Sequence, residues 1–373
     1  MPRRRSKKCP KTRVSSRTKR RRMNQSSKRR NGGGKGKSSE KTRGKKKKEK
    51  KEKKEKNKFS LTSYNILSSE FVYHIISPKT RQPEPEIIRN YRYNKIIDYL
   101  TKDSSTISLL QEVEPFLIQE LMVKKPHYSF SVSNSCISRY MIKGMETVAM
   151  NQLADSHRSK LGGSSGSRDD ERYLLDTWLS VPGSSTTTAI IWDTNIYKKI
   201  EEYQVCDDTY STYDGKNAII VVLQEKVGGK HLILCSFHLS GKGNRPAEDL
   251  LNAISLKMME FKETYSDTKA YMGGDSNRNR YDLEDMRKTF TEDWSIMGVS
   301  ETPTVCNHDY GVIHEPKRID FILGNNDNHD EGYKYDVEYF TEDCGIRPSS
   351  LEIYTRGNSP SDHFPVLISD LSF

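Results

Sequence analysis

Ser361-Asp362-His363-Phe364-Pro365 stands near the end of the sequence, directly before an apolar run. A Ser-Asp-His-x-Pro segment is weak evidence when it occurs alone. Four other polar phrases precede it, and each abuts a short apolar run of the kind that forms a strand. These phrases are Ser63-Tyr64-Asn65, Gln111-Glu112, Gly273-Gly274-Asp275-Ser276-Asn277 and Arg318-Ile319-Asp320. Acids, amides and a histidine at the ends of buried strands are the groups that metal-assisted phosphoester chemistry requires.

Charge divides the 373 residues into two unequal parts. Residues 1–58 contain 29 Lys and Arg and 4 Glu, a net charge of +25, whereas the other 33 Lys and Arg and 46 Asp and Glu give residues 59–373 a net charge of −13. The first segment is low in complexity and too poor in apolar residues to offset the entropy of ordering, so we expect a disordered basic tail. Such a tail binds polyanions or serves as a nuclear address. We therefore expect an intracellular protein of the nucleus or nucleolus, with the cytoplasm as the alternative.

The six cysteines give no sign of a zinc site or a redox motif, because no two of them lie within three residues of each other. Reduced cysteines in apolar surroundings are small core residues, and a reducing compartment is the expectation. No apolar run approaches the roughly 18–20 residues that cross a bilayer. No apolar stretch follows the basic start, as one would in a secretory signal. We therefore expect no membrane span.

Hydrophobic periodicity predicts strands that alternate with helices from Phe59 onward. Helices are predicted at residues 87–100, 116–122 and 247–265. Strands are predicted at residues 59–64, 107–110, 128–132, 188–192, 218–223, 232–237, 270–272, 319–323 and 366–368. Residues 139–187 are irregular and include a Gly/Ser run, which indicates a flexible insertion. The alternation predicts an α/β sandwich formed by residues 59–373.

The polar phrases contain the parts of a hydrolytic metal site. Glu112 has no basic neighbour in the sequence and suits a hard cation such as Mg²⁺, which binds through one or two carboxylates plus water. Asp275 and Asn277 lie two residues apart on an extended segment, so a carboxylate and a neutral amide donor face the same side. Asp320 beside His363 would form a pair in which the acid fixes the tautomer and orientation of the imidazole.

Each phrase also has an ordinary structural interpretation when it is taken singly. Asn65 would be a turn or cap residue, Gln111-Glu112 a solvated surface pair, and Gly-Gly-Asp-x-Asn a turn or a calcium loop. His238, which follows the apolar run at 232–237, would be a hydrogen-bonded histidine at a strand end. The conjunction of all these phrases, in order and at strand ends, favours the functional interpretation.

The conjunction resembles the endonuclease/exonuclease/phosphatase superfamily, the metal-dependent phosphoesterases related to DNase I. The matching segments span most of residues 59–373 and are Ser63–Leu67, Leu109–Val113, Phe237–Leu239, Gly274–Asn277, Arg318–Ile322 and Pro360–Pro365. The resemblance implies a four-layer sandwich of two packed mixed β-sheets flanked by helices, with the active site at one end. It also implies a catalytic domain at residues 59–373 that uses Mg²⁺ or Mn²⁺.

The resemblance further implies a role for each matching residue. Glu112 would bind the metal, with Asn65 beside it, and Asp362 would help to hold the metal or the water. Asp275 would orient or deprotonate the attacking water, and Asn277 would donate to the phosphate in the transition state.

The resemblance implies phosphate contacts as well. His238 would contact a phosphate oxygen, and His363 would contact the scissile phosphate, oriented by Asp320. The superfamily usually has a further Tyr or Arg in mid-chain near the phosphate. The residues considered for that position are Arg139, Tyr140 and Arg172.

The sequence specifies the substrate less well than the reaction. Ser63–Leu67 followed by Arg89-Asn90-Tyr91-Arg92 is similar to the deadenylase-like branch that trims RNA 3′ ends, although Ser276 stands where that branch often has an aromatic residue. The tail favours nucleic acid, because release of counterions strengthens the binding of a basic segment to a polyanion. The leading hypothesis is a divalent-metal-dependent nuclease that binds RNA or DNA through its active site and its basic tail.

Two alternatives remain open. The first is a phosphatase of the same fold that acts on an inositol phosphate or another phosphorylated small molecule. The acidic domain suggests it, as do Arg278 and Arg280, which would bind a substrate phosphate or would be ordinary solvated loop charges. The second is a non-catalytic nucleic-acid-binding protein that has kept the fold. Relatives of that kind would be expected to have lost a metal ligand or the Asp-His pair, whereas every main position is intact here.

Overall fold

The computed structural model describes residues 58–68, 86–104, 106–133, 187–206, 217–239, 244–265, 268–287, 294–298, 302–305, 308–309, 312–313, 317–325, 333–337 and 361–373. All of them belong to one compact unit, Lys53–Phe373. The expected disordered tail and flexible insertion lie outside the described residues, except for their last residues. Those two residues, Lys58 and Thr187, each begin a strand.

The first of two six-stranded sheets is formed by strands from the beginning and the end of the described chain. Its strands, in order across the sheet, are β13 (Lys334–Val337), β14 (Val366–Ser372), β1 (Lys58–Asn65), β2 (Thr106–Val113), β4 (Thr187–Asp193) and β3 (Tyr128–Val132). β1 and β2 run parallel, and the other neighbours are antiparallel. The sheet is therefore mixed.

The second sheet is formed by the middle of the chain. Its strands, in order, are β5 (Tyr197–Cys206), β6 (Asn217–Glu225), β7 (His231–His238), β8 (Thr268–Asp275), β12 (Asp320–Asn325) and β9 (Trp294–Ile296). β7 and β8 are parallel, and the remaining neighbours are antiparallel. A separate two-stranded ladder joins β10 (His308–Asp309) to β11 (Val312–Ile313).

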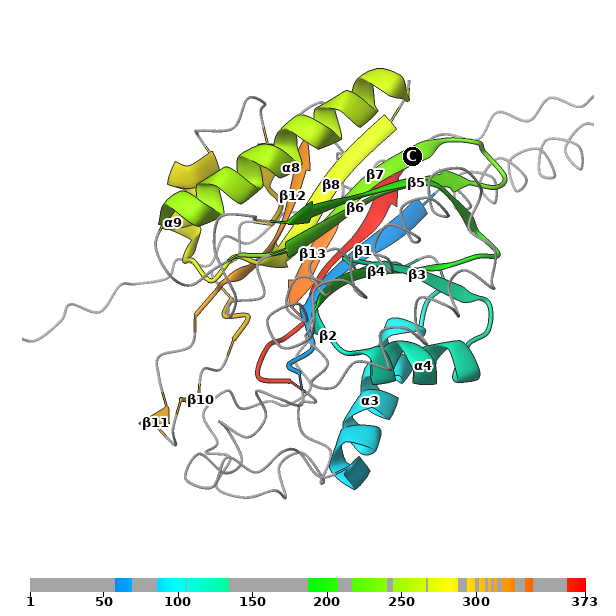
Figure 1. Cartoon of the computed structure of the whole chain (residues 1–373), viewed down its shortest axis with the longest axis vertical. Helices are drawn as coiled ribbons and strands as arrows, with labels where there is room; N and C mark the ends of the chain where they lie inside the picture. The colour runs from blue at the N-terminus through cyan, green and yellow to red at the C-terminus, as the bar shows by residue number, and fades with distance from the viewer. Residues whose placement is uncertain are drawn as a thin grey trace, which may run out of the picture. The chain divides into compact units, whose positions relative to one another are not determined.

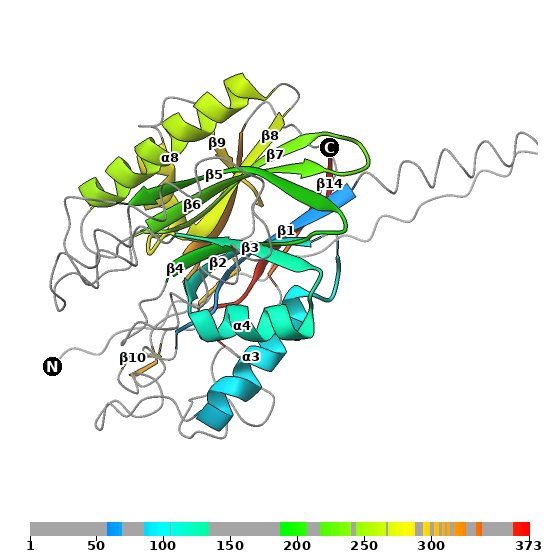
Figure 2. The same cartoon turned by 45° about the vertical axis from the view of Figure 1, so that its right-hand side comes forward.

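Helices cover the outer face of each sheet. α3 (Glu86–Leu100) and α4 (Pro115–Lys124) share an apolar cluster with strands of the first sheet. α8 (Asn244–Thr264) and α9 (Arg280–Arg287) share another with strands of the second sheet. The two helix groups lie on opposite sides of the paired sheets in Figure 1, and Figure 2 shows the same succession of layers from a second direction. None of the described helices is both long and apolar enough to cross a membrane.

A third apolar cluster fills the space between the sheets. Successive side chains of a strand point to opposite faces. In β6, Ile219 and Val221 accordingly lie in the cluster between the sheets, whereas Ile220 and Val222 lie in the cluster beneath α8. Because both faces of β6 are buried, its sequence is a continuous apolar run.

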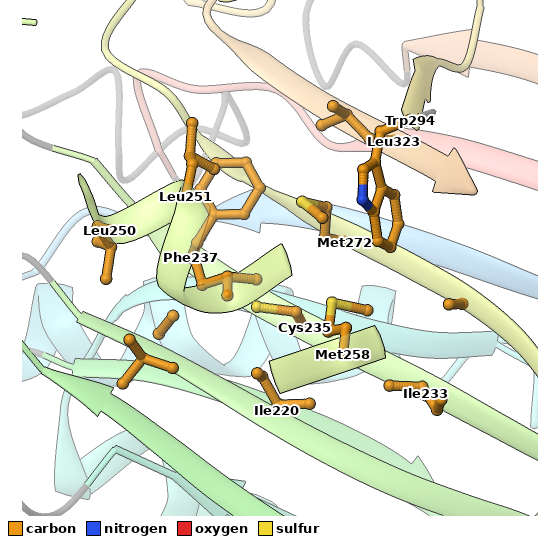
Figure 3. Packing of buried hydrophobic residues seen from close by; sticks show 14 of the residues in the cluster. Ile220, Ile233, Cys235, Phe237, Leu250, Leu251, Met258, Met272, Trp294 and Leu323 are labelled. Atoms are coloured by element: carbon orange, nitrogen blue, oxygen red, sulfur yellow. The ribbon is translucent and has the colours of Figure 1, made fainter. Parts of the chain in front are cut away.

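The cluster beneath α8 shows how this helix is held. Leu250, Leu251 and Met258 of α8 lie among side chains from the second sheet (Figure 3). The sheet residues labelled there are Ile220, Ile233, Cys235, Phe237, Met272, Trp294 and Leu323. Trp294 Nε1 also donates a hydrogen bond of 3.2 Å to the hydroxyl of Ser255. The packing fixes α8 over β7 and β8, two of the strands whose ends carry site residues.

The predicted four-layer sandwich of two mixed sheets is confirmed, and every helix and strand predicted from periodicity has a counterpart. The structure adds β5, α9, β9, β13 and the β10–β11 ladder. β5 has a physical reason for escaping prediction. It is an edge strand whose sequence alternates charged and apolar residues only in part, with Lys198-Lys199 and Glu201-Glu202 as adjacent pairs.

Candidate active site

Three neighbouring strands of the second sheet carry polar groups to the same edge. His238 at the end of β7 pairs with Asp275 at the end of β8. Asp275 in turn pairs with Asp320 at the start of β12. The two aspartates are buried. The register of the sheet thus places Asp275 between a histidine and a second acid.

Asn65 and Glu112 occupy an edge of the first sheet, near the ends of the parallel strands β1 and β2. The pairing of β2 with β4 shifts register between Leu110 and Val113, which places Glu112 in a β-bulge. The φ of Glu112 is 56°, in the left-handed region that non-glycine residues seldom adopt. Its carboxylate accepts hydrogen bonds from Asn65 Nδ2 at 3.0 Å and from the Ser68 amide at 3.1 Å. Strained backbone at a buried edge is characteristic of functional sites.

The side-chain amide of Asn65 connects the two sheets. Its Oδ1 accepts a hydrogen bond from the Leu67 amide at 3.1 Å, which fixes the orientation of the group. The Nδ2 atom then faces two acids, Glu112 Oε1 at 3.0 Å in its own sheet and Asp275 Oδ2 at 3.1 Å in the other. The residues predicted from separate phrases therefore meet at one place.

Gly273 and Gly274 permit this meeting through close approach. A Cβ on Gly273 would lie 2.8 Å from Leu109 Cδ1 and 3.2 Å from Ser63 Cβ, both in the opposite sheet. A Cβ on Gly274 would lie 1.8 Å from the carbonyl oxygen of Phe237 in the adjacent strand β7. A side chain at Gly273 would push the two sheets apart, and one at Gly274 would push β8 away from β7. Both changes would occur just before Asp275.

Asp320 and His363 form a hydrogen-bonded pair, with 2.9 Å between His363 Nδ1 and Asp320 Oδ2. Thr304 fixes the backbone beneath Asp320, because its hydroxyl oxygen accepts hydrogen bonds from the amides of Ile319 and Asp320, each at 3.0 Å. Burial raises the pKa of Asp320 to about 6, against the opposing effect of the His363 charge and hydrogen bond.

The charge of His363 follows from its surroundings. Burial alone would lower its pKa, but the charges of Asp320, Asp362 and Asp275 and the hydrogen bond to Asp320 outweigh burial. The pKa of His363 is therefore held well above its usual range. We infer an imidazolium whose Nε2, 3.8 Å from Asp275 Oδ2, presents a proton to the site.

The two oxygens of Asp275 have different surroundings. Oδ1 accepts a hydrogen bond of 2.7 Å from the backbone amide of Asn277. Oδ2 lies 3.1 Å from Asn65 Nδ2, 3.6 Å from His238 Nε2 and 3.8 Å from His363 Nε2. One oxygen thus anchors the group, and the other faces the nitrogen atoms of three predicted site residues.

Asn277 follows Asp275 in a second left-handed conformation, with a φ of 50°. Its Nδ2 donates to the Leu239 carbonyl at 2.8 Å and lies 3.2 Å from His238 Nε2. The amide is therefore held against the end of β7. The same nitrogen is the donor that the superfamily resemblance assigns to the phosphate.

Arg92 and Ser361 support the site, and the motifs did not assign either a role. The Arg92 side chain is buried, and its Nη1 donates to the carbonyls of Ile66 at 2.7 Å and Leu67 at 2.6 Å, directly after Asn65. Ser361 Oγ donates to the Asn65 carbonyl at 2.8 Å. Arg92 could have been identified from its spacing in the predicted helix, which places this charged residue on the buried face.

Ser361 also braces the segment that carries His363. Its hydroxyl oxygen accepts a hydrogen bond of 3.1 Å from the His363 amide. His363 itself pairs with Val305 in an isolated bridge next to Thr304. The backbone positions of Asn65 and His363 are thus linked through one hydroxyl group.

A set of donors at this edge suits a cation. Asp275, Asp320 and His363 each place a ligand atom within 4.8 Å of the others. Binding there would require the neutral imidazole, so a cation would displace the proton of His363. Asp362, which the superfamily resemblance assigns to the metal together with Glu112, has a buried Oδ1 that accepts no hydrogen bond from the described residues. Burial also raises the pKa of Asp362. A nearby cation would offset the free-energy cost of burying its charged carboxylate. Oxygen donors of this kind fit Mg²⁺ or Mn²⁺.

The remaining predicted residues are placed less centrally. Arg278 is almost fully buried, and its Nη1 donates to the Asn277 carbonyl at 3.0 Å, which favours bracing of the loop over contact with substrate. Arg280 is the first residue of α9. Arg139, Tyr140 and Arg172 lie outside the described residues.

Comparison with known proteins gives a fold but no close relative. No protein-family model and no curated protein matches the sequence. Among solved structures, TDP2 from D. rerio, complexed with a single-strand DNA product, is 13% identical with a TM-score of 0.52, over 84% of this chain and 98% of that chain. An endonuclease/exonuclease/phosphatase family protein from Bacteroides thetaiotaomicron is 14% identical with a TM-score of 0.54, over 84% and 97%.

A third similar structure has a different kind of substrate in its name. It is the mannosyl-6-phosphatase of Bacteroides thetaiotaomicron, 14% identical with a TM-score of 0.53, over 83% of this chain and 98% of that chain. At these identities the likeness concerns the fold, which hosts more than one chemistry. The chain thus has the fold of the endonuclease/exonuclease/phosphatase superfamily.

Proposed function

We propose that this protein is a divalent-metal-dependent phosphodiesterase that hydrolyses nucleic acid. The Asp275 carboxylate carries the proposal. One of its oxygens is anchored by the Asn277 amide, and the other faces Asn65, His238 and His363. A carboxylate held in this way accepts a proton from water, while nitrogen donors around it bind the oxygens of a phosphate.

The proposed reaction is a displacement at phosphorus. A water oxygen bonds to phosphorus, Asp275 takes the proton that the water loses, and the bond from phosphorus to the leaving oxygen breaks. The leaving oxygen keeps the bonding electrons and takes a proton from solvent water. His363, kept protonated and oriented by Asp320, donates its Nε2–H to a phosphate oxygen. His238 and Asn277 stand at the neighbouring strand end, and Asn277 Nδ2 would donate to the phosphate once it releases His238 Nε2. Donors therefore surround the charge that develops on the phosphate.

Glu112 and Asp362, with Asn65 beside Glu112, would hold Mg²⁺ or Mn²⁺. When bound there, the ion supplies neutralisation of the phosphate charge. In this proposal Asp275, Asp320 and His363 act as a hydrogen-bonded network, and Glu112 and Asp362 are the main ligands.

Nucleic acid is the favoured substrate for two reasons. Residues 1–58 carry a net charge of +25, which strengthens binding to a polyanion through counterion release. A protein of the same fold, TDP2, has been solved with a single-strand DNA product. We propose that the tail is a second contact for nucleic acid and that it directs the protein to the nucleus or nucleolus. Alanine at Lys19-Arg20-Arg21-Arg22 should then reduce nuclear accumulation of the full chain in fluorescence microscopy, and unchanged accumulation would contradict this.

A small phosphorylated substrate is the second candidate. It is supported by the net charge of −13 on residues 59–373 and by the occurrence of the fold in a mannosyl-6-phosphatase. A non-catalytic nucleic-acid-binding role is the third. The contacts among Asp275, Asp320 and His363 weigh against it, because binding alone requires none of them.

The test is incubation of the full chain with Mg²⁺ or Mn²⁺ and end-labelled single-stranded RNA, duplex DNA, abasic DNA, inositol phosphates or hexose phosphates. We expect cleavage of RNA or DNA that EDTA and Asp275→Asn each abolish. Asp98→Asn, which changes an exposed carboxylate on α3, should leave cleavage unchanged. Phosphate release from small molecules without strand cleavage would establish the second candidate. Binding of nucleic acid without turnover of any substrate would establish the third.

A further inference from the structure

A cation–π pair joins the beginnings of the two helices on the first sheet. The guanidinium carbon of Arg89, in the first turn of α3, lies 4.3 Å from the ring centroid of Phe116, in the first turn of α4. Phe116 is 38% exposed, and Arg89 is half-buried. The pair thus presents an aromatic ring and a positive charge together.

Arg89 forms no ion pair with any residue that the structure describes, and its buried Nε has no hydrogen-bond acceptor among them. Arg92, one turn later on the same helix, contrasts with it, because its Nη1 donates to two backbone carbonyls. A guanidinium has five N–H donors. Arg89 therefore retains donors for an anion that comes from outside.

The segments that carry the pair also carry contacts of the proposed site. Arg92 donates hydrogen bonds to the carbonyls of Ile66 and Leu67, and Arg89 precedes it by three helical positions, or about 4.5 Å along the axis. Phe116 follows Glu112 by four residues, so their Cα atoms are at most about 15 Å apart. Both members are therefore carried by segments that adjoin the proposed metal ligands.

We propose that Arg89 and Phe116 form a subsite for the nucleotide next to the scissile phosphate. The guanidinium binds a backbone phosphate, and the exposed ring stacks on a base. This inference rests on the proposed function and names the substrate form as single-stranded, because a base in a duplex has no free face to offer. Aromatic rings interleaved with positive charge are the recurrent device for binding a single strand without strong sequence preference.

The first experiment measures binding, with cleavage prevented by Asp275→Asn in every sample. Fluorescence anisotropy with a labelled single-stranded oligonucleotide, at physiological ionic strength, compares the full chain with Arg89→Ala and Phe116→Ala. Each substitution should weaken binding on the order of tenfold, as loss of one stacked base or one phosphate contact does. Lys95→Ala is the matched control, because Lys95 also lies over an aromatic ring, that of Tyr91, at 5.0 Å on the same helix. It should change the affinity by less than about twofold.

The second experiment measures hydrolysis with Asp275 intact. Arg89→Ala should raise KM for the oligonucleotide and leave hydrolysis of bis(p-nitrophenyl) phosphate, which has no neighbouring nucleotide, unchanged. Should Phe116→Ala unfold, Phe116→Leu keeps the apolar contact and removes the ring, and it should give the same loss of oligonucleotide affinity.

The outcomes separate the subsite from the proposed function. Cleavage of nucleic acid with unchanged oligonucleotide binding and KM in the Arg89 and Phe116 variants would overturn the subsite and leave the phosphodiesterase standing. Oligonucleotide binding that depends on both residues, in a chain that cleaves no nucleic acid, would support the subsite and overturn the proposed function. If Lys95→Ala weakened oligonucleotide binding as much as Arg89→Ala, Arg89 would act only through nonspecific positive charge. That result would also overturn the subsite.

Discussion

Alanine substitution of three glycines in neighbouring strands should destabilise the protein in a fixed order. Gly274→Ala should lower the free energy of unfolding most. A Cβ there would lie 1.8 Å from a backbone oxygen of β7, and that oxygen cannot move without breaking the β7–β8 ladder. Gly273 should be affected less, because its nearest neighbour would be the Leu109 side chain at 2.8 Å. Gly324 should be affected least, since its nearest atom is the flexible Met297 Sδ at 3.1 Å.

The magnitudes follow from what must move. Overpacking a core with one methyl group costs about 1–3 kcal/mol, which we expect for Gly273→Ala. A clash with the backbone of a paired strand belongs with the exceptional losses above about 4 kcal/mol, which we expect for Gly274→Ala. For Gly324→Ala, the entropy that alanine removes from the unfolded chain offsets part of the crowding, so the change should stay within about 1 kcal/mol.

Urea unfolding followed by fluorescence of the buried Trp192 and Trp294 measures the three free energies. Gly273→Ala should also lower hydrolysis, because it pushes the opposite sheet away just before Asp275. The reasoning fails if Gly274→Ala and Gly324→Ala unfold within about 0.5 kcal/mol of each other, which is the usual range of harmless substitutions.

Three further substitutions test the supporting contacts. Asp320→Asn should lower kcat roughly 10²- to 10⁴-fold with little change in KM, because His363 loses the group that orients and charges it; a kcat loss below tenfold argues against that role. Arg92→Met should lower the free energy of unfolding by about 2–4 kcal/mol, because two buried carbonyls lose their donor; urea unfolding within about 1 kcal/mol of the unchanged chain would contradict it. Asp370 has a φ of 63°, which asparagine also tolerates. Asp370→Asn removes a carboxylate whose pKa is lowered to about 2 by hydrogen bonds from Lys334 and Lys58. It should reduce stability by less than about 1 kcal/mol at pH 7, since the pair is exposed. That difference should be full above the ordinary Asp pKa of about 3.9 and disappear as pH falls through about 2; a difference that grows toward low pH would refute the assignment.

Most of the strands that could be predicted are buried on both faces. β6 and β7 are continuous apolar runs because a helix layer covers one side and the other sheet covers the second. β5 and β13 lie at sheet edges, where charged side chains are tolerated, and their sequences lack a clear period. Edge strands are specified by pairing with a neighbour, and pairing is a tertiary property that local periodicity does not record.

The site residues also fall into two groups, those that the sequence motifs identify and those that only the folded structure reveals. Asp320 and His363 could be paired from the sequence because both belong to recognisable phrases. Arg92, Ser361 and Thr304 could not, because each acts through a single hydrogen-bonding atom on backbone groups far away in the sequence. Arginine, serine and threonine are common residues whose solvated and structural uses look alike until the chain is folded.

The position of β14 has a consequence for protein synthesis. β14 is an interior strand of the first sheet, between β13 and β1, and it follows directly after His363. A ribosome delivers β1 early, but β1 waits without its partner β14 until the segment through Ser372 has emerged. Nascent chains that end before residue 363 lack both His363 and β14, which pairs with β1. The first sheet is therefore completed only after the segment that carries His363 has been synthesised, so the sheet and this part of the site form together.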